Sequence, residues 1–244
     1  MTGGAEPLDR AFTSPHAKQR YARRLFATIA ERYDLITVLL SFGLDRRWKA
    51  RAIELVEPVA GTRALDLASG TGDLAFALTS RGASVTGLDV THRMLQLARE
   101  KAAHRPAVRS PAFVTADMCA LPFPDAHFDI VTTGYGLRNV PDLNLAVDEI
   151  YRVLRPGGAV VSLDFNRPEN ALVRGVYLGY LWTIGGALGW LLHRDPDTYR
   201  YIPASIRRYP GAARVAGLMR SVGFSEARWI PVLGGLMAIH LARK

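Results

Sequence analysis

A glycine turn between an apolar run and a helix-like segment is the feature that most constrains this chain. Residues 63–69 lead into Gly70-Thr71-Gly72, and the apolar segment 74–78 follows directly. Glycine adopts backbone angles closed to other residues and lets a ligand lie against the main chain. A strand that stops at such a turn over a helix N-terminus is how an α/β fold binds a small ligand at its sheet edge. The pattern alone also fits a dinucleotide.

Further apolar runs follow the turn, and helical patterns separate most of them. The runs are 83–89, 112–116, 128–133 and 159–164, with helical patterns over 91–104 and 142–154. Alternating strands and helices predict a mainly parallel sheet with helices on both faces. Ligands of such sheets lie beyond the carboxyl ends of the strands.

Acidic residues accompany these runs. Asp89 and Asp117 end the second and third runs, whereas Asp66 lies inside the first. Asp89 is 17 residues beyond Gly72, near the spacing at which a strand-end carboxylate meets ribose hydroxyls.

Together these residues resemble a known family. Asp66-x-x-x-Gly70-x-Gly72, Asp89 and the segment 117–129 with Leu121-Pro122-Phe123 are similar to class I S-adenosylmethionine-dependent methyltransferases. A closer resemblance, from about Leu25 to the end, is to the ubiquinone/menaquinone biosynthesis C-methyltransferase family. It is carried by Tyr33-Asp34-Leu35, Leu40-Ser41-Phe42-Gly43, Gly134-Tyr135-Gly136-Leu137-Arg138-Asn139-Val140 and Asp195-x-Asp197-x-Tyr199-Arg200-Tyr201.

The resemblance implies a Rossmann-like α/β fold. Its sheet would have seven mostly parallel strands with helices on both faces, and a helical cover would be inserted after the fifth strand. A flexible or helical extension, 1–24, would precede one domain, 25–244. That domain would comprise a helical cap (25–60), a cofactor-binding core (61–166), an apolar and basic substrate cover (167–210), and a C-terminal helix with the last strands (211–244).

The resemblance also implies a reaction and a cofactor. Family members methylate a ring carbon of a prenylated hydroquinone, with S-adenosylmethionine as methyl donor and no metal. The amides of the 70–72 turn suit the carboxylate of the methionine part. Asp66 would meet the ammonium, Asp89 the ribose, and Asp117 the adenine amino group. The expected cofactor-binding residues are Asp66, Gly70, Thr71, Gly72, Asp89, Asp117, Met118 and Gly134.

Two of these positions depart from the family. Members often have a small residue in place of Met118 and serine in place of Gly134. Met118 would pack on the adenine ring, and only the backbone of Gly134 can contact the cofactor.

Carbon methylation needs a nucleophilic ring, which forms when the neighbouring phenol loses its proton. A base, or a group that stabilises the phenolate, should therefore lie near the hydroxyl. We expect Arg138, Asn139 and Tyr33 to take this catalytic role. The family match adds Tyr199, Tyr201, Ser205, Arg207 and His240 as substrate-lining residues.

An apolar segment and an excess of basic residues predict the partners of the protein. Residues 175–192 carry no charge, and the chain has a formal net charge of +9. The segment reaches the length of a membrane-span candidate, but its place inside the fold predicts a cover for the prenyl chain. Arginines from Arg194 to Arg220 would meet an anionic membrane. We expect a cytoplasmic enzyme, peripheral on the inner face of the cell membrane, with a homodimer possible.

Other functions remain open from the sequence. A basic chain can bind nucleic acid, but no recognised motif for it is present and no such partner is expected. A same-fold methyltransferase acting on another lipid-like or polyketide acceptor is one alternative, and a noncatalytic scaffold of a quinone-synthesis complex is another. A dinucleotide oxidoreductase is a third. The residues do not distinguish a naphthoquinol, such as demethylmenaquinol, from a benzoquinol.

Overall fold

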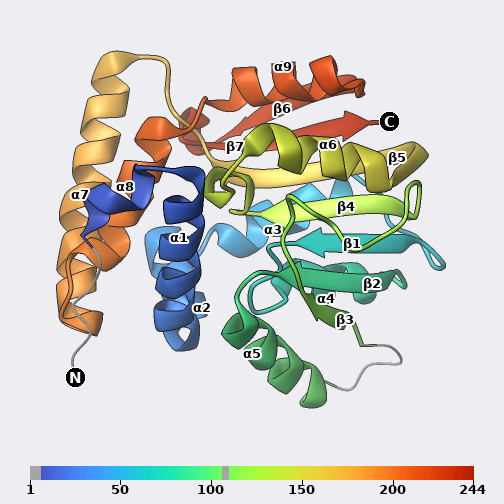
Figure 1. Cartoon of the computed structure of the whole chain (residues 1–244), viewed down its shortest axis with the longest axis horizontal. Helices are drawn as coiled ribbons and strands as arrows, with labels where there is room; N and C mark the ends of the chain where they lie inside the picture. Colours follow the sequence, from blue (N-terminus) through green and yellow to red (C-terminus); the bar gives the residue numbers. More distant parts are fainter. Residues whose placement is uncertain (1–6, 106–109) are drawn as a thin grey trace.

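A single mixed sheet organises the protein. In residues 7–105 and 110–244, which the computed structural model describes, seven strands pair in the order β3-β2-β1-β4-β5-β7-β6 (Figure 1). Strands β1 to β5 pair in parallel, whereas β7 is antiparallel to both β5 and β6. The strands are β1 Arg63–Leu67, β2 Ser84–Asp89, β3 Ala112–Thr115, β4 Phe128–Gly134, β5 Leu154–Phe165, β6 Ser225–Val232 and β7 Met237–Arg243. The mostly parallel seven-stranded sheet is confirmed.

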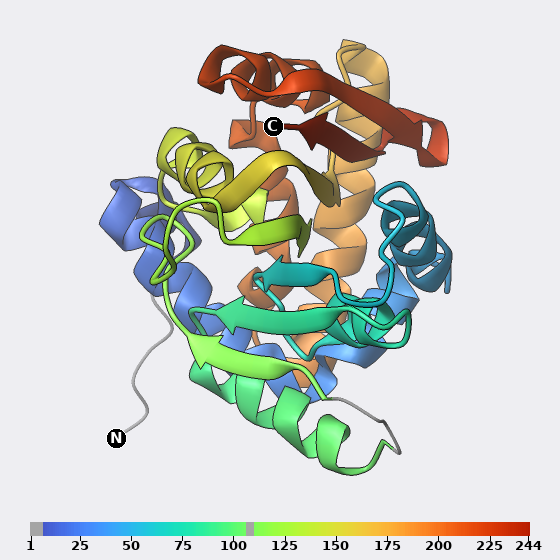
Figure 2. The same ribbon diagram turned by 90° about the vertical axis from the view of Figure 1, so that its right-hand side faces the viewer.

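Helices connect the strands and cover the sheet. The α-helices of the described residues are α1 Pro15–Ile29, α2 Tyr33–Leu40, α3 Asp45–Glu54, α4 Asp73–Thr79, α5 His92–Ala103, α6 Leu143–Val153, α7 Ala171–His193, α8 Asp197–Arg208 and α9 Ala212–Val222. Short 3₁₀ turns are η1 Leu8–Phe12, η2 Ala30–Arg32, η3 Leu137–Asn139 and η4 Leu233–Gly235. Figure 2 shows α5 against the β3 edge, and α9 with β6 and β7 at the opposite edge.

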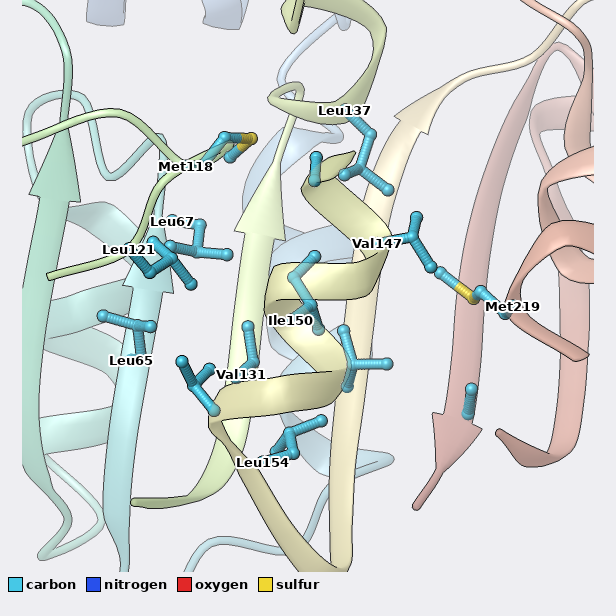
Figure 3. Close-up of a cluster of buried hydrophobic side chains, with 14 of the residues drawn as sticks. Leu65, Leu67, Met118, Leu121, Val131, Leu137, Val147, Ile150, Leu154 and Met219 are labelled. Carbon is cyan, nitrogen blue, oxygen red and sulfur yellow. The ribbon is translucent and has the colours of Figure 1, made fainter. Parts of the chain in front are cut away.

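Successive strand residues point to opposite faces, so the sheet builds two cores. On one face, Leu65 and Val131 pack with Val147 and Ile150 of α6 (Figure 3). On the other face, Ala64 and Ile130 pack with helices α3 and α4. Strands buried on both faces read as continuous apolar runs, which is why these segments stood out in the sequence.

The remaining helices gather at the carboxyl ends of the parallel strands. Helices α1, α2, α7 and α8 lie together on that side of the sheet (Figure 1). Helices α7 and α8 follow β5, as the predicted cover requires. Helix α1 runs through the expected boundary at residues 24 and 25, so the extension and the cap are continuous there. Residues 1–6 of the expected extension lie outside the described residues.

Helix α7 is the one helix of the described residues that is long and apolar enough to cross a membrane. Its glycines have a packing reason. A Cβ at Gly189 would lie 2.5 Å from the carbonyl oxygen of Asp195, and one at Gly185 would lie 3.1 Å from that of Tyr199. These glycines therefore let α8 approach the α7 backbone, and they make α7 one half of a helix pair.

Local details differ between the starts of two helices. Asp142 caps α6, because its Oδ1 accepts from the amides of Asn144 and Leu145. Thr91 precedes α5, but its side chain makes no capping bond. Asp89 accepts from the Thr91 amide instead, at 2.7 Å. Strand β5 also begins earlier than expected, at Leu154.

Candidate active site

Two neighbouring cavities lie beyond the carboxyl ends of the strands. The first cavity, of about 80 Å³, is lined by the turn after β1, the ends of β2 and β4, and helix α1. The second cavity, of about 150 Å³, is lined mostly by apolar side chains of α1, α2, α7 and α8. Phe26, Tyr33 and Tyr135 line both. A small pocket beside them holds Asp66, Lys49 and Asp73.

Asp66 is buried within β1 with one oxygen unpartnered. Its Oδ1 accepts from the hydroxyl of Thr132 at 2.8 Å, while its Oδ2 has no hydrogen-bond partner. Burial raises the pKa of Asp66 to about 7, and the bond from Thr132 limits the rise. A buried carboxylate lacking a partner is costly, so this oxygen suits a cationic ligand group.

The turn after β1 is tied to β2 by Asp89. The Oδ2 of Asp89 accepts from the amide of Gly70 at 2.9 Å. Burial raises the pKa of this carboxyl, and the amides of Thr91 and Gly70 oppose that shift. Asp89 lines the first cavity, so the residue both shapes the turn and faces the predicted ribose position.

The two glycines of the turn have different roles. Gly70 has φ +55° and lines the first cavity, where an added Cβ would come no closer than 3.9 Å to another atom. Gly72 has φ +92°, and an added Cβ would lie 2.8 Å from the ring of Phe76. Gly72 lines neither cavity, so its observed role is to start α4. Thr71 is held by Asp34, whose Oδ1 accepts its hydroxyl at 2.6 Å.

The far end of the first cavity is formed by Asp117 and Met118, with Gly134 on the β4 side. Asp117 accepts from the amide of Cys119 at 2.9 Å and from the side chain of Gln19 at 2.5 Å. Gln19 of α1 lines the same cavity. Nothing in the sequence singled it out, because a polar residue on an amphipathic helix is ordinary.

Arg138 is the one charged residue among the described residues that line the mostly apolar second cavity. Its Nε donates to Asp164 at 3.2 Å, and its Nη1 donates to Asn139 at 3.2 Å and to the hydroxyl of Ser205. The guanidinium also lies over the ring of Phe165, 5.0 Å from its centre. Burial raises the pKa of Asp164, and Arg138 opposes that shift. Sequence reasoning missed Asp164, although it ends a predicted strand.

Asn139 and Tyr33 occupy the junction of the cavities. Asn139 lines the first cavity and donates from Nδ2 to the carbonyl of Tyr135 at 2.8 Å. Tyr33 lines both cavities. Burial raises the pKa of Tyr33 to about 12, which keeps its hydroxyl neutral.

Tyr135 is a second residue that the sequence reasoning left without a role. It has an unusual φ of +61° and donates its hydroxyl to the buried Asp45 at 2.5 Å. Lys49 pairs with Asp45 at 2.7 Å and with Asp73 at 2.9 Å. Burial opposes the charge of Lys49, but Asp73 and Asp45 together raise its pKa. The pairs link the cap helix α3 to the junction.

The predicted substrate residues divide into three groups. Tyr199 and Tyr201 are buried and line the second cavity. Ser205 is buried but acts on Arg138 rather than lining the cavity. Two expectations need correction. Arg207 is exposed on the outer side of α8. His240 is buried in β7, bonded to the carbonyl of Ala212 at 3.1 Å, and faces α9 instead of the site.

Comparisons with known proteins place this arrangement in a family. Residues 15–244 match the ubiE/COQ5 methyltransferase family. The chain belongs to this family. A demethylmenaquinone methyltransferase of Thermus thermophilus is 43% identical over 219 residues, which are 89% of this chain and 98% of that protein. A ubiquinone/menaquinone biosynthesis C-methyltransferase of Marinomonas sp. is 38% identical, over 91% of this chain and 90% of that protein.

Solved structures agree on the fold of this methyltransferase. A SAM-dependent methyltransferase of Aquifex aeolicus has a TM-score of 0.57 at 15% identity, over 80% of this chain and 88% of that chain. A phosphoethanolamine N-methyltransferase of Haemonchus contortus with bound S-adenosyl-L-methionine has a TM-score of 0.60 at 16% identity, over 81% of this chain and 52% of that chain. The enzyme is an S-adenosylmethionine-dependent methyltransferase. The scaffold and other-acceptor alternatives are not favoured.

The residues present fit that cofactor. The unpartnered Oδ2 of Asp66 suits its cationic methionine end. The expected role of the turn amides needs correction, because the amide of Gly70 donates to Asp89 and that of Gly72 to the carbonyl of Ser69. Asp89 and Asp117 offer acceptors in the first cavity, with Met118 as an apolar surface. Among the described residues, no group of three or more His, Cys, Asp or Glu side chains could hold a metal ion.

Proposed function

We propose that this enzyme methylates a ring carbon of a prenylated quinol, converting demethylmenaquinol to menaquinol. The observation that carries the proposal is the pairing of a polar cluster around Arg138 with a mostly apolar second cavity that adjoins the first. A quinol head has hydroxyls for the cluster, and its prenyl tail matches the apolar walls. The relative from Thermus thermophilus is named a demethylmenaquinone methyltransferase.

Arg138 is placed to stabilise the phenolate form of the ring. The guanidinium presents N–H donors and no acceptor, and Asp164 and Ser205 fix its orientation. A preorganised charge in a site that excludes water stabilises a developing oxyanion strongly. Asn139 donates from its amide to the backbone of Tyr135, which holds the polar side of the junction in place. S-adenosylmethionine supplies an electrophilic methyl group when bound.

Tyr33 and Tyr135 complete the junction. The pKa values of both are raised by burial, so both side chains remain neutral. Their rings line both cavities, and they exclude water from the place where the two cavities meet. Neither tyrosine therefore serves as the base, and we propose that the quinol hydroxyl loses its proton to solvent before methyl transfer, while the phenolate that remains is held against the guanidinium of Arg138.

We also propose that the enzyme takes its substrate from the membrane, as a peripheral protein on the cytoplasmic face. A prenylated quinol is insoluble in water, and the net charge of +9 favours an anionic surface.

Turnover tests this function directly. Purified enzyme is incubated with S-adenosylmethionine and either reduced demethylmenaquinone or a demethylated benzoquinol, and the product mass is recorded. We expect a gain of one methyl group on the naphthoquinol. Binding of S-adenosylmethionine without methylation of either ring would overturn the proposal.

A further inference from the structure

The second cavity opens to the surface between three apolar side chains. Phe42, Tyr180 and Leu233 line the cavity and are nevertheless 69%, 40% and 43% exposed. They come from the turn after α2, the middle of α7 and η4. A residue that is both lining and exposed marks the mouth of a cavity. The entrance therefore lies between α2 and α7 and is framed by apolar groups.

The outward face of α2 continues this apolar frame. Ile36 points into the protein and lines the cavity. Leu35, Val38 and Leu39 lie on the outer side and are all exposed. A surface helix of a globular protein normally turns polar or charged residues outward. Apart from Asp34, which pairs with Lys101, the water-facing side of α2 is apolar, which indicates a non-aqueous neighbour.

Helix α7 adds a second apolar strip on the other side of the mouth. Val176, Tyr180 and Ile184 are spaced four residues apart and are exposed, so they form one row along the helix. The glycine-rich side of α7 contacts α8, and that contact leaves this row uncovered. Contiguous exposed apolar patches of this kind mark interaction surfaces.

Positive charge lies next to the mouth. Arg46 and Arg47 follow Phe42 by four and five residues, both are exposed, and neither forms an ion pair recorded among the described residues. Two of the arginines that the sequence suggested for this purpose have other contacts. Arg200 stacks on Trp182 and lies near Asp197, and Arg208 stacks on Phe12.

We infer that this mouth surface docks on an anionic lipid bilayer and admits the prenylated quinol directly from the membrane. The inference rests on the proposed function, because it assigns an entrance to that substrate. The mouth surface consists of Leu35, Val38, Leu39, Phe42, Val176, Tyr180, Ile184 and Leu233.

Two features favour a bilayer over a second copy of the chain. A second copy seated here would cover the entrance to the second cavity, whereas a bilayer supplies what must enter. Apolar groups backed by arginines also match the interfacial region of a membrane, where apolar faces insert by about 5–10 Å and cations meet anionic headgroups. The apolar and basic groups of the surface and the position of the cavity entrance therefore both favour a bilayer as the partner.

Vesicle binding of the full chain tests the surface without using substrate. The variant Leu39→Glu/Val176→Glu changes two exposed residues that do not line the cavity. The control Val59→Glu/Leu145→Glu makes the same change at two exposed apolar residues outside both cavities. Equal melting temperatures for both variants establish that each is folded. We expect the first to lose at least about tenfold in affinity for anionic vesicles, and the control to match the wild type.

A second pair of measurements identifies the partner. Arg46→Gln/Arg47→Gln should weaken binding to vesicles containing phosphatidylglycerol and leave binding to neutral vesicles unchanged. Turnover of a long-chain quinol in vesicles should fall in Leu39→Glu/Val176→Glu through a higher KM, while a short-chain quinol in solution is methylated at the wild-type rate.

Two outcomes would overturn the docking surface. One is wild-type vesicle binding by Leu39→Glu/Val176→Glu. The other is a lipid-free dimer that this variant dissociates, since a second copy would then be the occupant. The wild-type enzyme could also bind vesicles through the mouth surface and methylate neither quinol. That result would support the docking surface and overturn the proposed function.

Discussion

The guanidinium of Arg138 and the carboxylate of Asp164 form a buried ion pair, with Nε 3.2 Å from Oδ1. The second oxygen of Asp164 accepts from the backbone amide of Arg138 at 3.0 Å. One carboxylate at the end of β5 thus fixes both the backbone and the side chain of the residue that we propose to face the quinol. Ser205 of α8 holds the same guanidinium from the cover side.

Arg138→Ala should abolish turnover while cofactor affinity stays within about twofold of the wild type. Arg138 lines the second cavity and not the first, and loss of a preorganised oxyanion contact costs about 100-fold or more in rate. Steady-state kinetics and calorimetry with S-adenosylmethionine measure the two effects. A parallel loss of cofactor binding would contradict this role.

Asp164→Asn should lower the free energy of unfolding by about 3 kcal/mol, because it leaves the buried charge of Arg138 unpaired. The double variant Arg138→Ala/Asp164→Asn should regain part of that stability and remain inactive. Urea denaturation of the two single variants and the double variant measures the coupling. Additive losses of stability would show that the two side chains do not interact.

Cofactor binding should strengthen as the pH rises through about 7. Free Asp66 has a pKa raised to about 7 by burial, and a cationic ligand favours its ionised form, so binding releases a proton at lower pH. The affinity should rise by up to about tenfold per pH unit below pH 7 and level off above it. Asp66→Asn should bind weakly at every pH. Calorimetry in two buffers of different ionisation heat counts the protons, and a flat wild-type profile would refute this role.

The same carboxyl makes a predictable contribution to stability. Burial raises the pKa of Asp66 from its ordinary value of 3.8 to about 7 in the folded protein. Between these two pH values the folded state therefore holds a proton that the unfolded chain has released. This group therefore lowers the free energy of unfolding as the pH rises from about 4 to about 7, and adds no further change above that. Asp66→Asn should lack this part of the pH dependence in thermal denaturation of the ligand-free protein.

Tyr135→Phe and Asp45→Asn should each reduce kcat about tenfold through misplacement of the ring at the junction of the cavities. The two residues share one hydrogen bond, so the double variant should be little worse than either single variant. Tyr151→Phe is the matched control, since Tyr151 lies on α6 outside both cavities. Fully additive losses would argue against a shared role.

Alanine substitutions at two glycines of α7 should change the stability of the protein in opposite directions. At Gly189 an added Cβ would lie 2.5 Å from the carbonyl oxygen of Asp195, whereas at Gly179 it would meet nothing within 4 Å. Gly189→Ala should therefore separate α7 from α8 and lower the melting temperature. Gly179→Ala should stabilise the helix by about 1 kcal/mol. Calorimetry measures the melting temperatures of both variants. Equal changes in melting temperature would contradict the packing role of Gly189.

The cofactor half of the site was largely predictable because its geometry is local. The turn at Gly70 follows β1 directly, and Asp89 and Asp117 follow the ends of β2 and β3. Parallel strands bring such ends to one edge, so sequence order translates into proximity. The structure places Asp66, Gly70, Asp89 and Asp117 around the first cavity and its adjoining pocket.

Site residues whose positions depend on how the cap and cover helices fold back over the sheet were harder to predict from the sequence. Gln19 and Asp45 reach the site from α1 and α3, far from it in sequence. His240 shows the opposite case, because the sequence predicted it at the site and the structure places it away from the site. It pairs with Ser162 in the sheet, and that register turns its side chain toward α9. A shift of one residue would reverse the face, and β7 is buried on both faces, so no alternation of apolar and polar residues in its sequence specifies the register of this interior pair.

The sequence by itself determined the order of strands and helices, the glycine turn and the acids that follow it, because these depend on backbone freedom and hydrophobic periodicity over a few residues. Only the tertiary structure decided which groups hold Arg138, how Tyr135 is anchored, and where the second cavity opens. Those depend on contacts between segments such as Asp164 and Ser205, or Phe42 and Tyr180, that only chain folding brings together.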